Sequence, residues 1–218
     1  MTDHAAPTEL RTYKDFLDFC NARPGLPVTQ IDSVEEKKGG EVLLTIHFVK
    51  AECMLAFLRD SNDSRSVIDI FERLYLELRP DIFMNLMPVL LGDNGSEFSD
   101  PKALEFDRQG NQRTHVFYCD PSASFQKCSA ERNHEFIHMF IPKGTPLDNY
   151  TQKDISLMMD HINSYGRASL GNRCPYEVME FLYGTGITGL LGCHRIAPDE
   201  VTLNGSIFNK EVRTNDQL

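Results

Sequence analysis

The stretch Met87-Pro88-Val89-Leu90-Leu91-Gly92-Asp93-Asn94-Gly95 decides the fold of this chain. It begins as an apolar run and breaks abruptly into Gly-Asp-Asn-Gly. A short apolar run of this kind indicates a strand that is buried on both faces, with helices packed above and below the sheet. Asp93 would then project just beyond the end of a buried strand.

Three further strands are predicted upstream of this run. The first spans Val28 to Glu35 and is followed by a Lys-Lys-Gly-Gly turn at residues 37–40. Apolar side chains alternate from Val42 to Phe48, which is the period of a strand. A third apolar run from Cys53 to Leu58 completes the set.

Helices surround these strands in the chain. One is expected over Thr12–Asn21, and one begins at Asp63 or Ser64 and ends before Pro80. A fifth strand candidate, Thr114 to Cys119, is followed by helical patterns over Ser129–Phe140, Thr151–Tyr165 and Pro175–Tyr183. This order of elements predicts an α/β layered domain.

The composition bounds the class of protein. A chain of 218 residues with 41% apolar and 25% charged residues fits one globular domain. It has no apolar run near the roughly 20 residues that a membrane span needs, and its acidic start is unlike a secretion signal. Six cysteines without a C-x-x-C pair predict reduced thiols in the cytoplasm. The net charge of −10 argues against nucleic acid as partner, unless positive charge is local or a DNA-binding module is missing.

Three acidic residues stand at suggestive places. Asp32 lies inside the first strand, where a buried carboxylate needs a partner such as a metal ion. If the first and fourth strands are neighbours, the carboxylates of Asp32 and Asp93 converge. Glu131 falls in the first turn of the helix predicted over Ser129–Phe140. Such an oxygen-rich pocket suits Mg²⁺ or Mn²⁺, and two ions about 3.5–4 Å apart could activate a water or a 3′-hydroxyl. Among 32 Asp and Glu residues, however, such a triple is also expected by chance.

A different metal site is open on local grounds. His134-Glu135-Phe136-Ile137-His138 matches H-E-x-x-H, in which two imidazoles on one helix face bind zinc and the glutamate acts as general base. Glu177 or Glu180 would supply the third ligand. The extended metzincin form fails, because Ile141 stands where glycine is required.

Several ordered motifs resemble one family. Leu90 to Ser99 (LLGDNGSEFS) is similar to the second-aspartate motif of DDE transposases and retroviral-type integrases. Phe117 to Lys127 (FYCDPSASFQK) resembles the block before the catalytic glutamate in the insertion-sequence-30 family of bacterial transposases. The stretches at 30–35 (QIDSVE), 141–145 (IPKGT) and 161–165 (HINSY) resemble that family too, so the likeness runs from about residue 11 to about residue 202.

The resemblance implies a ribonuclease H-like core, a mixed five-stranded sheet flanked by helices, at residues 27–184, after a lead-in segment (1–26) and before a C-terminal extension (185–218). It implies metal ligation by Asp32, Asp93 and Glu131, with two Mg²⁺ or Mn²⁺ ions, and cleavage and joining of DNA. The partners would be transposon inverted repeats and target DNA, bound by a homo-oligomer in the bacterial cytoplasm at the nucleoid. The candidate DNA contacts are Lys127, Arg132, Lys143 and Arg167.

The chain departs from the family pattern around the third ligand. Phe125 stands in place of the usual Trp, Cys128 in place of Gly, and Arg132 in place of an Asn. The helix-turn-helix region expected before the core is also absent, because Asp32 comes too early. We therefore expect a catalytic core alone, from a truncated, fragmentary or degenerate transposase. A catalytically dead remnant that binds DNA or dimerises remains the alternative.

Overall fold

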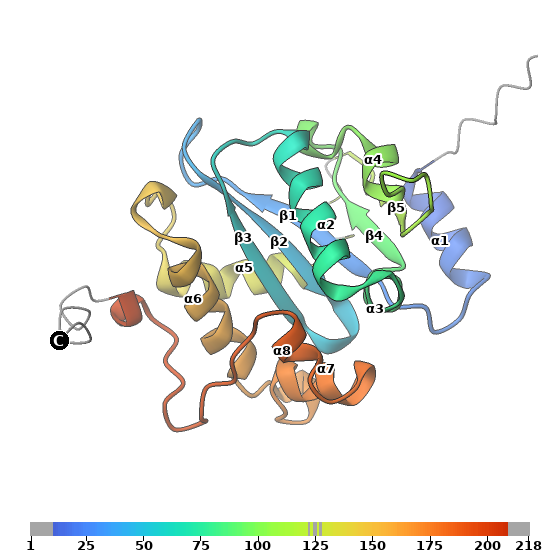
Figure 1. Cartoon of the computed structure of the whole chain (residues 1–218). Coiled ribbons are helices and arrows are strands. Elements are labelled where there is room, and N and C mark those ends of the chain that lie inside the picture. The colour runs from blue at the N-terminus through green and yellow to red at the C-terminus, as the bar shows by residue number, and fades with distance from the viewer. Residues whose placement is uncertain (1–10, 122, 124–125, 127, 209–218) are drawn as a thin grey trace, which may run out of the picture.

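The computed structural model describes residues 11–121, 123, 126 and 128–208, with the helical backbone alone for residues 128–132. Figure 1 shows a central twisted sheet with helices on both faces. The sheet has five strands in the order β3-β2-β1-β4-β5. Their bounds are β1 Thr29–Val34, β2 Val42–Phe48, β3 Cys53–Arg59, β4 Val89–Gly92 and β5 His115–Tyr118.

The sheet is mixed. β1, β2 and β3 pair antiparallel, whereas β4 lies parallel to both β1 and β5. All seven residues of β2 are buried, so the alternation of apolar residues along this strand does not mark one solvent-facing side. β2 lies between β3 and β1, and helices cover both of its faces. The predicted mixed five-stranded sheet is confirmed.

Eight α-helices lie in the described part of the chain. They are α1 Tyr13–Asn21, α2 Ser64–Leu78, α3 Pro80–Leu86, α4 Pro101–Glu105, α5 Cys128–Phe140, α6 Gln152–Ser164, α7 Pro175–Tyr183 and α8 Ile187–Leu190. Thr12 and Thr151 begin α1 and α6 with capping boxes, and Asp63 caps α2 by accepting from the Ser66 backbone N–H. These caps agree with the predicted helix starts.

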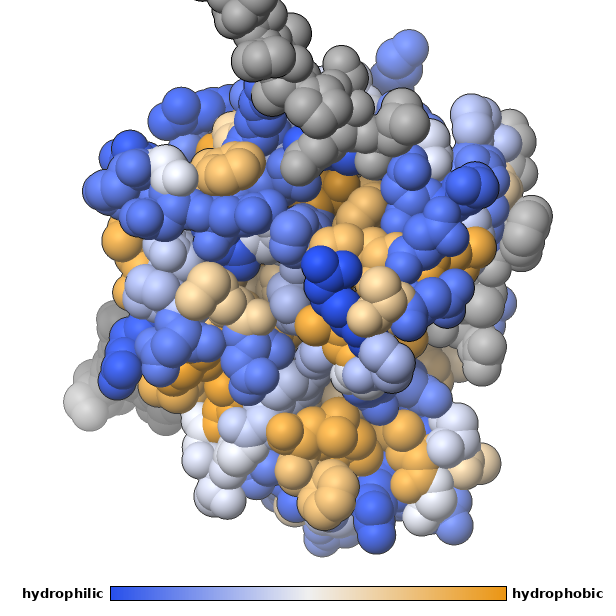
Figure 2. All heavy atoms as spheres, turned by 90° about the vertical axis from the view of Figure 1, so that its right-hand side faces the viewer, coloured by the Kyte–Doolittle hydropathy of each residue, from blue (hydrophilic) through white to orange (hydrophobic). Residues whose placement is uncertain are grey.

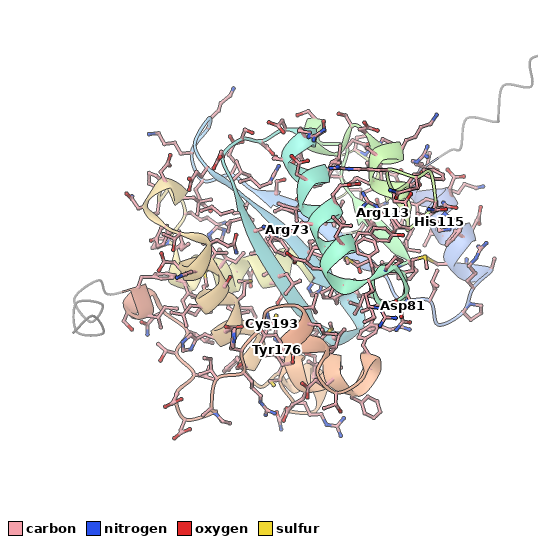
Figure 3. The ribbon with its side chains drawn as sticks, in the orientation of Figure 1. Arg73, Asp81, Arg113, His115, Tyr176 and Cys193 are labelled. Carbon is pink, nitrogen blue, oxygen red and sulfur yellow. The ribbon has the colours of Figure 1, made fainter. Side chains whose placement is uncertain are left out.

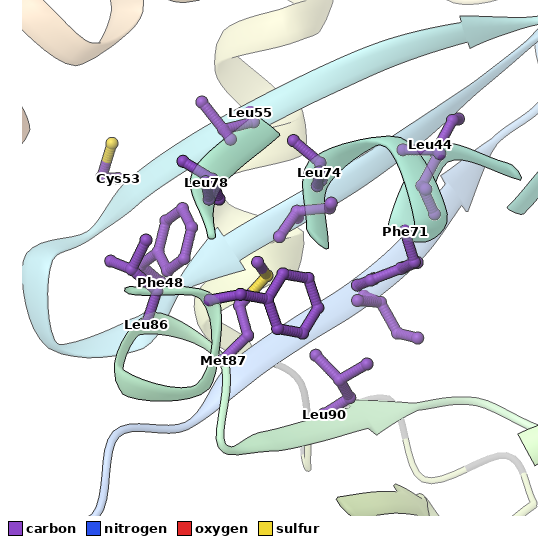
Figure 4. Packing of buried hydrophobic residues seen from close by; sticks show 14 of the residues in the cluster. Leu44, Phe48, Cys53, Leu55, Phe71, Leu74, Leu78, Leu86, Met87 and Leu90 are labelled. Carbon is purple, nitrogen blue, oxygen red and sulfur yellow. The ribbon is translucent and has the colours of Figure 1, made fainter. Parts of the chain in front are cut away.

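Two helical layers bury the sheet. On one face, α2, α3 and α7 pack on side chains that include Leu44, Phe48 and Leu55; Figure 4 shows Phe71, Leu74 and Leu78 of this layer against them. On the other face, α5 and α6 cover Leu43, Met54 and Ala56, and α1 covers β4 and β5. Helix α5 lies over the face of the sheet to which Asp32 belongs.

Short helices were not predicted from the sequence. Pro80 does end α2, at a positive φ of 69° on Arg79, but it also occupies the first turn of α3. Proline fits a first turn because no hydrogen bond to its nitrogen is needed there. No helix in the described residues is long and apolar enough to cross a membrane.

The residues after α7 pack on the same body. Ile187 joins the core on the α2 face, and Leu203, Ile207 and Phe208 pack against the core on the α5 face. Exposed apolar side chains gather on α7 and α8, where Phe181 is 81% and Leu190 55% exposed; Figure 2 shows apolar surface in this lower part of the molecule. The domain boundaries at 26/27 and 184/185 stay predictions.

Candidate active site

Asp32 lies inside β1, and Asp93 directly follows β4, the parallel neighbour of β1. Thr29 pairs with Leu90 and Gln30 with Leu91, so two further residues along the same register bring Asp32 beside Asp93. A Cβ atom on Gly92 would lie 3.2 Å from Cγ1 of Ile31, which shows that the register continues. Neighbouring strands are about 4.7–4.9 Å apart. The carboxylates therefore start from adjacent backbone positions.

Both aspartates belong to the same face of the sheet. Ile31 and Leu90 point into the core under α2, and side chains alternate along a strand. Asp32 and Asp93 therefore fall on the opposite face, which α5 covers. Each is half-buried. Oδ1 of Asp32 accepts from the Ser33 backbone N–H at 2.9 Å, and Oδ1 of Asp93 accepts from the Gly95 N–H at 3.0 Å.

Helix α5 begins near Asp32. Glu131 lies in the first turn of α5, although its side chain is outside the described residues. One turn later, His134 Nε2 lies 3.0 Å from the Thr45 hydroxyl, which donates to the backbone oxygen of Asp32 at 3.2 Å. Thr45 is also the antiparallel partner of Asp32. This chain of contacts fixes the start of α5 over the strand that carries Asp32.

A third described carboxylate stands close to Asp93. Glu97 is 7% exposed, and a Cβ atom on Gly95 would overlap its carboxylate while lying 3.0 Å from Asp93 Oδ1. Glycine at position 95 thus lets the carboxylates of Asp93 and Glu97 approach each other. Glu97 was not predicted as a site residue, although it stands four residues after Asp93 in the same motif.

Arg59, the last residue of β3, contacts Ser33, the residue that follows Asp32. It is 3% exposed, and its Nη2 donates to Oγ of Ser33 at 2.8 Å. Burial lowers the pKa of Arg59, and the nearby charges of Glu97 and Asp63 oppose that shift. The guanidinium thereby gives positive charge to the acidic end of β1. Nothing in the local sequence around Arg59 signals this contact.

The two histidines of the H-E-x-x-H match are held by different partners. His134 contacts Thr45, whereas Nδ1 of His138 lies 3.4 Å from both the Ile141 carbonyl oxygen and Oε1 of Glu36. Glu177 caps α7 and pairs with Arg195 at 2.6 Å. Among the side chains that the structure describes, no three His, Cys, Asp or Glu form a metal-binding group.

The four predicted DNA contacts differ in what the structure shows. Lys127 lies outside the described residues, and so does the side chain of Arg132. Lys143 is exposed in the loop that follows α5. Arg167 is only 8% exposed, and burial lowers its pKa. It lines a cavity beside α5 instead of standing on the open surface.

Curated proteins similar to this chain are transposases of insertion sequences. Transposase InsI for IS30A of Escherichia coli is 29% identical over 117 residues, which are 54% of this chain and 27% of that protein. The transposase for IS1086 of Cupriavidus metallidurans is 30% identical over 64 residues, 29% of this chain and 19% of its own length. The chain thus spans about a quarter or less of these relatives. No protein-family model matches the chain.

A solved viral intasome structure shares the fold. The simian T-cell lymphotropic virus intasome, in complex with PP2A regulatory subunit B56 gamma, aligns with a TM-score of 0.52 at 12% identity, over 71% of this chain and 55% of that one. The catalytic core domain of BIV integrase aligns with a TM-score of 0.49 at 16% identity, over 71% of this chain and 93% of that one. With the observed sheet order, the chain has a ribonuclease H-like fold, and its sequence resembles the IS30 transposases.

Proposed function

We propose that this chain is the catalytic domain of a DDE-type transposase, which cleaves DNA at transposon ends and transfers the strands to target DNA. The observation that carries the proposal is the parallel pairing of β1 with β4, whose register puts Asp32 of β1 beside Asp93, the residue after β4, on the face that α5 covers. Asp32, Asp93 and Glu131 are the proposed metal ligands. Since the matched segment is a small part of each relative, the activity and its substrates are inferred for this segment.

The residues present fit divalent metal ions. Two half-buried carboxylates on adjacent strands repel each other unless a cation lies between them, and carboxylate oxygens are the ligands that Mg²⁺ and Mn²⁺ prefer. When bound, two such ions would lower the pKa of an attacking water or 3′-hydroxyl and stabilise the leaving oxygen. Glu131 would complete the ligand set.

The chain's own residues orient these ligands. The Ser33 backbone N–H holds Oδ1 of Asp32, and the Gly95 backbone N–H holds Oδ1 of Asp93, so each carboxylate has a fixed orientation. The contact between His134 and Thr45 holds the beginning of α5 against β2. A ligand that is fixed before binding loses less freedom when the metal or the substrate arrives.

The proposed partners are the inverted repeats of the transposon, target DNA and further copies of this chain, inside a bacterial cell at the nucleoid. Lys127, Arg132, Lys143 and Arg167 would contact DNA phosphates. The chain carries a net charge of −10, so DNA binding depends on local positive charge around the site, and we expect binding to weaken steeply with salt.

The test is metal-dependent nicking of a labelled duplex that carries the DNA flanking this protein's gene. Asp93→Asn should lower the rate about 100-fold or more with Mg²⁺ or Mn²⁺, because several kcal/mol of charge stabilisation are lost. Asp81→Asn is the matched control, since Asp81 is exposed and pairs only with Arg79 among the described residues; Figure 3 shows it away from β1. Both variants should unfold at similar urea concentrations.

The catalytically dead alternative has a distinct outcome. If the wild-type chain does not cut DNA, either alone or fused to a helix-turn-helix region, the enzyme proposal fails. Full activity of Asp93→Asn would overturn the ligand assignment even if the wild type cuts DNA. Activity that depends on one tightly bound zinc ion per chain would instead favour the H-E-x-x-H site.

A further inference from the structure

A cavity of about 360 Å³ opens between α5, β2 and the segment that follows α6. Its wall is unusually polar for the inner face of a helix. His47, Asn133 and Arg167 are 0%, 2% and 8% exposed, and Glu52 and Ser169 line the rim. Buried polar groups are costly unless they are paired, so each partner in this cavity is informative.

One edge of the Arg167 guanidinium is satisfied by the protein. Nη1 donates to Oδ1 of Asn133 at 2.6 Å and lies 3.6 Å from Oε2 of Glu52. Asn133 is in turn held by His47, whose Nδ1 lies 3.0 Å from the amide nitrogen. Glu52 is held by the Ser169 hydroxyl at 2.9 Å. The orientation of the guanidinium is thus fixed by four side chains.

The other edge of the same guanidinium has no partner among the described residues. Nε and Nη2 of Arg167 are both buried without a hydrogen bond. These two nitrogens present parallel N–H groups, the fork that binds two oxygens of a carboxylate or phosphate. Leaving buried charged donors without a hydrogen-bond partner destabilises the fold. An oxyanion would remove that cost.

An aromatic ring lies against the guanidinium. The Phe136 ring centroid lies 4.7 Å from Cζ of Arg167, and the centroid of the Tyr165 ring, a residue that is 43% exposed, lies 6.1 Å from that of Phe136. Nε and Nη2 are closed to solvent, so a neighbouring side chain must move before an anion reaches them. Phe136 is half-buried and contacts the guanidinium, so we expect its removal to ease access to the fork.

The cavity adjoins the proposed catalytic carboxylates. His47 lies two residues beyond Thr45 on β2, about 7 Å along the strand from the partner of Asp32. Asn133 follows Glu131 by two residues on α5. A DNA strand whose reacting phosphate lies at Asp32 and Asp93 would thus have a neighbouring phosphate within reach of the cavity.

We propose that this cavity is an oxyanion subsite, in which Arg167 takes up a backbone phosphate of the DNA strand next to the one that reacts. The choice of DNA as the source rests on the proposed function, whereas the oxyanion chemistry rests on the unpaired fork alone. Arg167 then acts inside a cavity, not as a contact on the open surface.

The first experiment uses inorganic phosphate and the full chain. The Arg167 Nε–H signal in a ¹H–¹⁵N spectrum, assigned by its loss in Arg167→Lys, should shift saturably as phosphate is added. Arg167→Lys keeps the charge but not the fork, so its phosphate affinity, compared with that of the wild type by calorimetric titration, should fall about tenfold or more. Phe136→Ala should bind phosphate more tightly than the wild type. If the Arg167 Nε–H signal shifts with phosphate neither in the wild type nor in Phe136→Ala, the subsite is wrong.

The second experiment asks whether the anion comes from DNA. Binding of a labelled single strand is followed against salt in Ca²⁺, and Arg167→Gln should reduce the slope of log K against log salt by about 0.7, the loss of one phosphate contact. Arg65→Gln is the matched control, because Arg65 is exposed on α2, on the opposite face of the sheet. Phosphate binding with an unchanged DNA slope would overturn DNA as the source. If the wild type binds no DNA, the proposed function fails, and the phosphate titration still decides the subsite.

Discussion

Acidification from pH 7 to pH 5 should cost this protein about 2 kcal/mol of folding stability through His47 alone. His47 is fully buried on β2, and its Nδ1 faces the Asn133 amide nitrogen at 3.0 Å. Burial lowers its pKa to about 3, with the charges of Arg167 and His134 adding to that shift. The folded protein therefore keeps this imidazole neutral.

Stability falls with pH because the unfolded chain binds a proton at His47 that the folded chain does not. In the unfolded chain the histidine has a pKa near 6.5, so between about pH 6.5 and pH 3 the unfolded state binds a proton that the folded state rejects. The stabilisation is complete above pH 6.5 and is lost as pH falls, at about 1.4 kcal/mol per pH unit. At pH 5 the loss is about 2 kcal/mol, before most carboxylates begin to titrate.

Urea unfolding at pH 7 and pH 5 measures this loss. His47→Gln should remove about 2 kcal/mol of the pH dependence, because a neutral amide cannot take up the proton. Contributions from His161, whose pKa burial also lowers, cancel in this comparison. An equal pH dependence in wild type and His47→Gln would refute the argument.

Two further predictions concern buried charge and close packing. Arg113→Met should destabilise the fold by about 3–5 kcal/mol in urea unfolding, because the side chain of Arg113 is fully buried, pairs with Glu72 at 3.2 Å and donates to two carbonyl oxygens of α4; Figure 3 shows it between the sheet and the helices. A loss below 1 kcal/mol would contradict this. Gly95→Ala should weaken Mn²⁺ binding, since a Cβ atom there would overlap the Glu97 carboxylate and crowd Asp93. Adding Glu97→Ala should restore the affinity, and failure of that rescue would show that the crowding is not the cause.

Most of the fold could be predicted from local patterns. The apolar run at 87–91, which ends at Gly-Asp-Asn-Gly, predicted both ends of β4 to within two residues. The caps Asp63 and Thr151 predicted where α2 and α6 begin. The helices α3 and α4 have seven and five residues. That is too short for a helical period to stand out, and Pro80 indicated only an end.

The site could be predicted only where a residue's role depends on its own strand. Asp32 and Asp93 stand inside or directly after strand patterns, so parallel pairing of those strands suffices to bring them together. Arg167 is different. Its partner Asn133 lies 34 positions away in the chain, and its partner Glu52 lies between β2 and β3. Its burial comes from tertiary packing, which no local pattern reports. For the same reason Arg59 and Glu97 were missed.

The most direct test of the central claim is an anomalous difference map from crystals of this chain soaked in Mn²⁺. We expect one ion bound by oxygens of both Asp32 and Asp93, at the distances of about 2.0–2.2 Å usual for hard divalent ions. We expect a second ion about 3.5–4 Å away that Glu131 helps to bind. A map without manganese between Asp32 and Asp93, or with metal only at His134 and His138, would contradict it.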